Sequence, residues 1–140
     1  MDKQSLEMIE LELAILIRRT TSNSINKRIG NLDRSAYLIL RRIVEKGAVG
    51  VKVLAEEFQL DISTISRQGA ALEHKGYLYR IPDALDGRAY YLQITELGKK
   101  ELFDYKQARL ERITELVEDW SEEECKIFGK LLKKFNQSFK

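Results

Sequence analysis

The stretch 51-VKVLAEEFQLDISTISRQGAALEHKG-76 decides the fold that the sequence predicts. Residues 51–58 place apolar side chains at helical spacing, and the turn at Leu60-Asp61 separates them from a second helix, which Asp61 caps and Gly76 ends. The apolar and small residues of the second helix are expected to face the core, namely Ile62, Ile65, Gly69, Ala70, Ala71 and Leu72. Two short helices joined by a tight turn form a helix-turn-helix unit.

The opposite side of the second helix is polar and is the predicted recognition face. Short hydroxyls allow close approach to a duplex, and a guanidinium and an amide can pair with base edges or phosphates. The residues of this face are Ser63, Thr64, Ser66, Arg67 and Gln68. Ser and Thr in a first helical turn can also be ordinary capping residues. Five neighbouring polar residues opposite an apolar face favour the DNA-reading interpretation.

The pattern changes from helical to alternating after Gly76. Residues 77–81 and 90–94 alternate and are rich in aromatic and β-favouring side chains, with a turn-rich loop at 82–89 between them. Pro82 is tolerated at a strand end, where the backbone need not donate to the ladder. The sequence therefore predicts an antiparallel hairpin with a long tip, which would form a wing beside the helix-turn-helix.

Arg88 on this projecting loop is a candidate for entering a DNA minor groove, where narrow A·T tracts concentrate negative potential. Asp86 is the candidate that would hold the Arg88 guanidinium in place. Turn geometry alone explains Asp86-Gly87 equally well.

Apolar side chains at helical spacing also predict helices ahead of residue 51. A first helix is expected from about residue 4 to the mid-20s, ending before Gly30-Asn31. Asp33 then caps another helix, and Gly47 stops it in the C′ position.

Two further helices are expected after the hairpin. Thr95 caps a long one, and Ser121 with Glu124 forms a capping box for the last. The predicted order is four helices, a hairpin and two helices. This is a mainly α fold with a small β-hairpin wing, a winged helix-turn-helix with long dimerisation helices at both termini.

The terminal helices carry apolar stripes that a small winged helix of residues 33–94 cannot cover completely. The predicted interface residues are Leu6, Ile9, Leu13, Leu131, Leu132, Phe135 and Phe139. Exposed patches of this kind mark partner surfaces, so a homodimer is expected, although some packing between the two termini also occurs in this interpretation. Twofold pairing would set the two reading helices about 34 Å apart, one DNA turn, which predicts an inverted-repeat operator.

The net charge of +2 is too small to indicate nucleic-acid binding by itself, but its distribution is uneven. Residues 18–46 contain eight basic and two acidic residues, a net charge of +6. This band is either a solvated helix face or a phosphate-facing surface. Arg34, Arg41 and Arg42 are the candidate phosphate contacts within it.

Composition excludes several classes of protein. With one Cys and one His, the chain has no disulfide framework, and neither a Cys-rich zinc site nor a His-clustered metal site is expected. We find no nucleophile–base pair and no Gly-rich phosphate loop, so we expect no enzyme, cofactor or metal. No apolar run approaches the roughly 18 residues of a membrane helix. Residues 1–5 lack the basic start of a signal peptide, and the lone thiol of Cys125 fits a reducing cytoplasm.

Five segments together resemble the MarR family of winged-helix bacterial transcription regulators. They are LAEEF (54–58), LDISTISR (60–67), LEHKGYL (72–78), DGRA (86–89) and LQITELG (92–98). Each segment alone is weak, but the combination is specific, and the resemblance covers nearly the whole chain. It implies one unit over residues 1–140, with dimerisation helices at 1–30 and 96–140.

The resemblance also implies a homodimer with a recognition helix in the major groove and a wing arginine in the minor groove. It assigns the first role to the recognition face and the second to Arg88. Family wings often carry additional basic residues, whereas Ala89-Tyr90 follow here, so wing binding is expected to be weaker or to depend more on Arg88. The expected function is that of a ligand-responsive repressor, with the effector in a crevice between the dimer helices and the reading domain. A protein-interaction module and a redox sensor acting through Cys125 are the alternatives.

Overall fold

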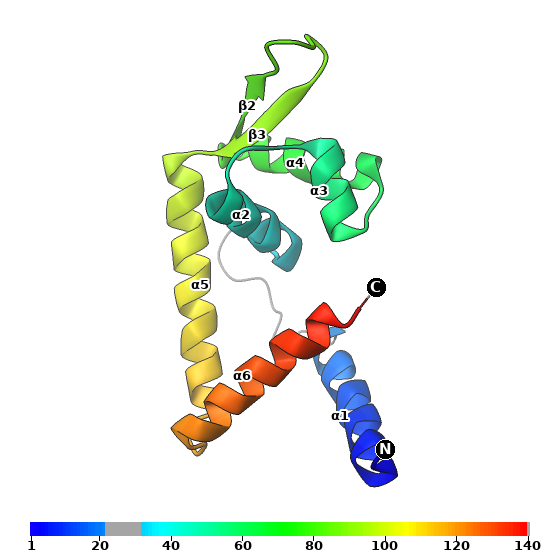
Figure 1. Cartoon of the computed structure of the whole chain (residues 1–140). Coiled ribbons are helices and arrows are strands. Elements are labelled where there is room, and N and C mark those ends of the chain that lie inside the picture. The colour runs from blue at the N-terminus through cyan, green and yellow to red at the C-terminus, as the bar shows by residue number, and fades with distance from the viewer. Residues whose placement is uncertain (22–31, 140) are drawn as a thin grey trace. The chain divides into compact units, whose positions relative to one another are not determined.

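The structure, a computed structural model, describes residues 1–21 and 32–139, and it confirms a mainly helical fold with a small β-hairpin wing (Figure 1). The predicted end of the first helix at Gly30-Asn31 lies outside the described residues. The elements in chain order are α1 (Lys3–Thr21), α2 (Arg34–Lys46), β1 (Val49–Gly50), α3 (Val51–Phe58), α4 (Ile62–His74), β2 (Leu78–Pro82), β3 (Tyr90–Ile94), α5 (Glu96–Leu116) and α6 (Glu122–Gln137).

Short-range hydrogen bonds set the ends of α2 as predicted. The Asp33 carboxylate accepts the backbone N–H of Ala36 at 2.8 Å. Gly47 has a φ of 91°, which favours glycine, and its N–H donates to the carbonyl of Ile43 at 2.7 Å.

Capping also sets the starts of the two C-terminal helices. The Thr95 hydroxyl accepts the N–H of Gly98 at 3.0 Å, and Ser121 and Glu124 form the predicted capping box. Asp61 occupies the N-cap position of α4, but its side chain forms no capping hydrogen bond.

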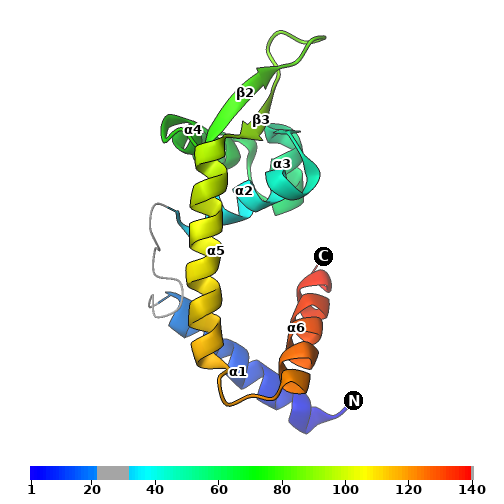
Figure 2. The same ribbon diagram turned by 90° about the vertical axis from the view of Figure 1, so that its left-hand side faces the viewer.

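The sheet has three antiparallel strands in the order β1-β3-β2. The predicted hairpin is present, with Leu78 opposite Ile94 and Pro82 opposite Tyr90. The strand β1, in which Val49 pairs with Leu92, was not predicted, because two residues are too short to show an alternating pattern. In both ribbon views β2 and β3 project beyond α2, α3 and α4 (Figure 2).

One core joins α2, α3, α4, the sheet and the first turns of α5. Its largest fully buried side chains are Leu32, Ile39, Leu40, Ile43, Leu54, Ile65, Leu78 and Leu92. Burying each such side chain contributes roughly 1.5–3 kcal/mol. The core holds α4 by one face only, and this leaves the opposite face of that helix open.

The prediction that α4 buries Ile62, Ala70 and Ala71 is wrong. Ile62 is 52% exposed, and both alanines are exposed. Ile65, Gly69 and Leu72 form the buried stripe, and helical geometry turns the two alanines away from it. Ile62 stands at the edge of the stripe in the first turn, where it borders a surface hollow instead of the core.

The chain divides into two units, residues 1–106 and 107–140, and each is described by itself. In the second unit Trp120 packs edge-on against Phe128, with ring centroids 5.4 Å apart. No residue of α6 is buried.

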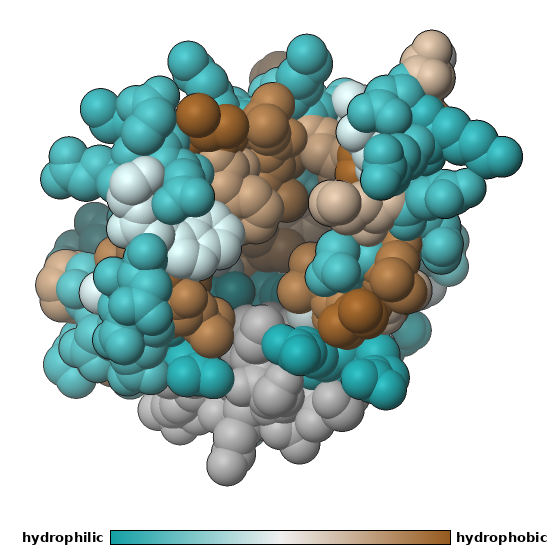
Figure 3. Space-filling model, turned by 90° about the horizontal axis from the view of Figure 1, so that it is seen from below, coloured by the Kyte–Doolittle hydropathy of each residue, from teal (hydrophilic) through white to brown (hydrophobic). Residues whose placement is uncertain are grey.

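Large apolar side chains are exposed on both terminal helices, and brown patches mark the surface seen in Figure 3. Leu6 and Ile9 of α1 are 48% and 47% exposed, and Leu13 is half-buried. The exposed apolar residues at the other terminus are Leu131, Leu132, Phe135 and Phe139. None of the helices in the described ranges is long and apolar enough to span a membrane.

Candidate nucleic-acid interface

The outward face of α4 is a polar surface supported by a rigid core. Ile65 and Leu72 anchor the helix, while Ser63 and Arg67 point to the opposite, exposed side. Thr64 and Ser66 flank this face and are half-buried, and an Arg67 guanidinium nitrogen lies 3.5 Å from the Thr64 hydroxyl. These four residues form what we call the reading face, which can present hydroxyl and guanidinium groups to a ligand.

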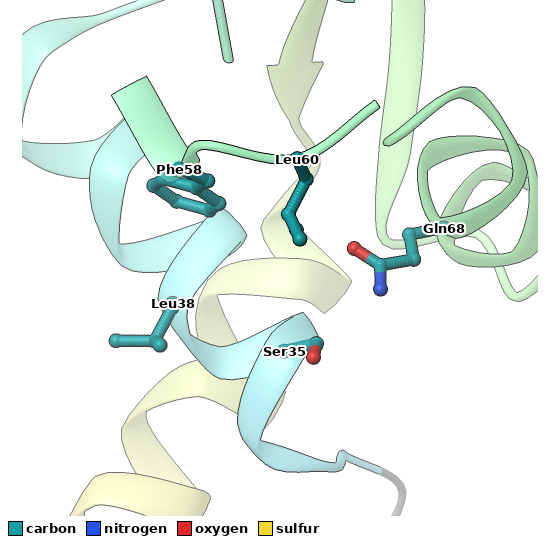
Figure 4. Close-up of a pocket in the computed structure, with 5 residues that line it drawn as sticks. All are labelled: Ser35, Leu38, Phe58, Leu60 and Gln68. Atoms are coloured by element: carbon teal, nitrogen blue, oxygen red, sulfur yellow. The ribbon is translucent and has the colours of Figure 1, made fainter. Parts of the chain in front are cut away.

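Gln68 does not share the reading face, which corrects the prediction. It lies three residues after Ile65 and four before Leu72, so helical geometry directs it toward α2. Figure 4 shows its side chain beside a pocket of about 270 Å³, lined also by Ser35, Leu38, Phe58 and Leu60. Among the described residues its Oε1 is buried and has no hydrogen-bond partner.

Two aspartates organise the tip of the wing. Asp83 accepts the backbone N–H of Leu85 at 2.8 Å and the Tyr91 hydroxyl at 3.0 Å. The backbone hydrogen bond from Leu85 lowers the pKa of Asp83 most, and the bond from the Tyr91 hydroxyl lowers it further. The Asp83 carboxylate, which accepts that bond, raises the pKa of Tyr91. Sequence reasoning missed Asp83, although an Asp directly after Pro in a loop is a common turn signal.

The role predicted for Asp86 is also corrected. Its carboxylate accepts the backbone N–H of Arg88 at 3.0 Å, so it shapes the turn instead of holding the guanidinium. The Arg88 side chain remains exposed on the wing.

A second arginine ties the wing to α4. The Nε of Arg80 in β2 lies 2.9 Å from a carboxylate oxygen of Glu73, near the end of α4. The same guanidinium stacks over the Tyr90 ring, 4.1 Å from its centroid. These contacts fix the wing relative to the reading helix, and sequence reasoning missed them because the partners lie on different elements.

Two of the three arginines of α2 are engaged within the chain. Arg42 forms a bidentate ion pair with Glu57 of α3, at 2.6 and 2.9 Å, which lowers the pKa of Glu57 and raises that of Arg42. Arg41 bonds to the Tyr37 hydroxyl and to Glu45. Of the three candidate phosphate contacts on α2, only Arg34 is exposed and outside these pairs.

The cations near the reading face, unlike Arg41 and Arg42, are not neutralised by carboxylates of the described residues. Within the described ranges Arg67, Arg88 and Lys52 form no ion pair. A hollow of about 340 Å³ lies between α3, α4 and the wing, and its lining includes Lys52, Ile62, Ser66 and Arg88, together with Asp83, whose carboxylate is bonded to Tyr91. Unneutralised cations beside exposed hydroxyls make a surface suited to a polyanion.

Comparison with known proteins identifies the family of this chain. The sequence model of the MarR family matches residues 32–90. Over 139 residues the chain is 48% identical to YxaD of Bacillus subtilis, an uncharacterised HTH-type transcriptional regulator, and the match covers 99% of this chain and 97% of that one.

Solved structures share the fold. A MarR family protein from Bacillus stearothermophilus superposes with a TM-score of 0.76 at 21% identity, covering 98% of this chain and 96% of that one. FabT of Streptococcus pneumoniae, solved in complex with DNA, superposes with a TM-score of 0.65 at 20% identity, covering 97% and 96%.

Proposed function

Because the chain belongs to the MarR family and is a transcriptional regulator of that type, we propose that it binds an inverted-repeat operator as a homodimer and represses transcription until a small-molecule effector releases it. Double-stranded DNA is then its macromolecular partner, and the cytoplasm is the place where it acts.

The observation that carries this proposal is the reading face together with the nearby cations, which form no ion pair within the part of the chain that the structure describes. Arg67 stands exposed on the helix that would enter the major groove, where guanidinium groups pair with guanine. Arg88 stands exposed on the wing, at a position suited to the minor groove. Arg34 is assigned to phosphate, whereas Gln68 is excluded from base contact because it points toward α2.

The exposed apolar faces of α1 and α6 support a homodimer. Leu6 of α1 is 48% exposed, Leu131 of α6 is 57% exposed, and Phe139, just beyond the end of α6, is 70% exposed. Faces of this kind are expected to be covered by a partner, and a second copy supplies a matching one. In this arrangement residues 33–94 read DNA, while 1–30 and 96–140 hold the dimer together.

The effector part of the proposal follows from the two-headed arrangement. A dimer fits an inverted repeat only when its two reading helices have the spacing of the half-sites. A small molecule that binds more tightly to a dimer with a different spacing of the reading helices shifts the population away from the DNA-binding form.

The test is selection of bound sequences from a random duplex pool, followed by affinity measurements on single variants. Arg67→Ala is expected to weaken specific binding by about 5- to 150-fold for each half-site, the equivalent of roughly 1–3 kcal/mol per base contact, and the homodimer loses this contact in both half-sites. Arg88→Ala is expected to weaken it as well. Arg112→Ala is the matched control, since Arg112 is an exposed α5 arginine paired with Glu115.

The dimer must persist in these variants, which sedimentation checks at the same protein concentration. If specific duplex binding survives both Arg67→Ala and Arg88→Ala, the reading face is not the DNA contact, and the protein-interaction alternative gains support.

A further inference from the structure

Ile62 is an apolar side chain displayed on the side of the molecule that carries the cations. It is the first residue of α4 and is 52% exposed, whereas Ile65, one turn later, is fully buried. It lines the hollow that also contains Lys52, Ser66 and Arg88. The core is therefore filled without Ile62, and its aliphatic group borders a mixed surface, on which Val51, Tyr90, Tyr91 and the Asp83 carboxylate lie beside the cations.

Ile62 lies at a position of the helix-turn-helix from which side chains can reach DNA bases. Scattered apolar side chains are normal at protein surfaces, and a β-branched residue is no better in a first helical turn than many polar ones. In helix-turn-helix proteins, however, the N-terminal residues of the second helix are those that reach base edges. Ile62 occupies that place, next to Ser63.

The major groove offers one apolar group to such a side chain. Guanine, cytosine and adenine present only hydrogen-bond donors and acceptors there, while thymine adds its 5-methyl group. The hydroxyls of Ser63 and Ser66 can pair with more than one base, so they discriminate weakly. An aliphatic contact supplies the discrimination that they lack.

We propose that Ile62 is a specificity-determining residue that packs on a thymine methyl group at one fixed position in each operator half-site. This inference rests on the proposed function, because it requires α4 to lie in the major groove. It selects an A·T pair at that position and disfavours cytosine, which has no methyl group.

The expected effect is modest and local. Loss of one methyl-sized apolar contact weakens binding about fourfold, and loss in both half-sites weakens it about fifteenfold. The chain itself loses little stability on truncation, since Ile62 is half exposed.

The experiment combines protein and DNA substitutions, using the full chain and its selected duplex. Each thymine is replaced in turn by deoxyuridine, which lacks only the 5-methyl group, and affinity is measured for wild type and Ile62→Ala. One symmetric position is expected at which deoxyuridine weakens the wild type about fourfold per half-site but leaves Ile62→Ala unchanged.

Two further variants sharpen the result. Val53→Ala removes an exposed aliphatic group of α3 outside the hollow and is expected to keep the wild-type sensitivity to deoxyuridine. Ile62→Val retains most of the contact and is expected to keep most of the discrimination.

The inference is overturned if Ile62→Ala responds to deoxyuridine at every position as the wild type does. It is equally overturned if no position is sensitive in the wild type. A wild type that binds no duplex specifically removes the proposed function together with this inference, so the two failures are distinguishable.

Discussion

Replacing Gly98 by alanine is expected to destabilise the protein, because α5 starts in close contact with the sheet. A Cβ at Gly98 would overlap the backbone carbonyl oxygen of Tyr77 and lie 2.7 Å from the Cγ1 of Ile94. The Tyr77 carbonyl also accepts the N–H of Thr95 at 3.0 Å, so it cannot shift freely. Ile94 is buried and has little space into which to move.

The magnitude follows from three contributions. Overpacking by one methyl group costs about 1–3 kcal/mol, and a strained or lost hydrogen bond adds about 0.5–1.5 kcal/mol. The higher helix propensity of alanine returns about 1 kcal/mol. The net loss is about 0.5–3.5 kcal/mol, which corresponds to a fall in melting temperature of roughly 2–12 °C for a chain of this size.

Thermal unfolding followed by far-UV circular dichroism measures this loss, with all proteins at one concentration because dimers melt according to concentration. Gly129→Ala in α6 is the matched control. A Cβ there meets nothing within 4 Å in the chain, so its melting temperature is expected to stay the same or rise. A melting temperature for Gly98→Ala equal to or above that of wild type would refute the close approach of α5.

Three other perturbations have definite outcomes. Glu57→Gln removes the partner of Arg42 and is expected to cost about 1–2 kcal/mol near pH 7. The pKa of Glu57 is lowered in the folded state, so denaturant titrations should show this difference fully above about pH 5 and lose it as the pH falls below about 4. Arg80→Gln removes the ion pair that joins the wing to Glu73, and quantitative gel shifts should show weaker duplex binding by a protein that is still a dimer. Unchanged affinity would mean that the position of the wing does not contribute to DNA binding. Leu131→Glu places a charge in the apolar face of α6, and sedimentation should show monomers; a persistent dimer would locate the interface elsewhere.

The helix boundaries could be predicted because their determinants are local. Asp33 and Thr95 each cap a helix through a residue three positions later, and Ser121 bonds reciprocally with Glu124. Gly47 ends α2 through a backbone conformation that glycine adopts readily. Signals of this kind lie within one helical turn and need no knowledge of the tertiary structure.

The features that could not be predicted depend on contacts between distant residues. Glu57 neutralises Arg42 from 15 residues away, and no local pattern distinguishes that arginine from a free one. The orientation of Gln68 follows from the direction in which α4 packs on α2, and Ile62 is exposed because the core ends before the first turn of α4. The residue type gives the chemistry of a side chain, but the packing of the helix that carries the residue decides which way the side chain points.

Site-directed cleavage of the selected operator tests the central claim most directly, because it shows where the outer side of α4 lies on DNA. Ala70 is exposed on that side beyond Arg67, so Ala70→Cys in a Cys125→Ser background places a DNA-cleaving reagent there without removing a proposed contact. We expect two clusters of cuts about 10 base pairs apart, one from each protomer. Leu38→Cys, which places the reagent by the pocket behind α4, should cut weakly. Equal cutting from both positions, or no paired clusters from Ala70→Cys while the protein stays bound, would contradict the account.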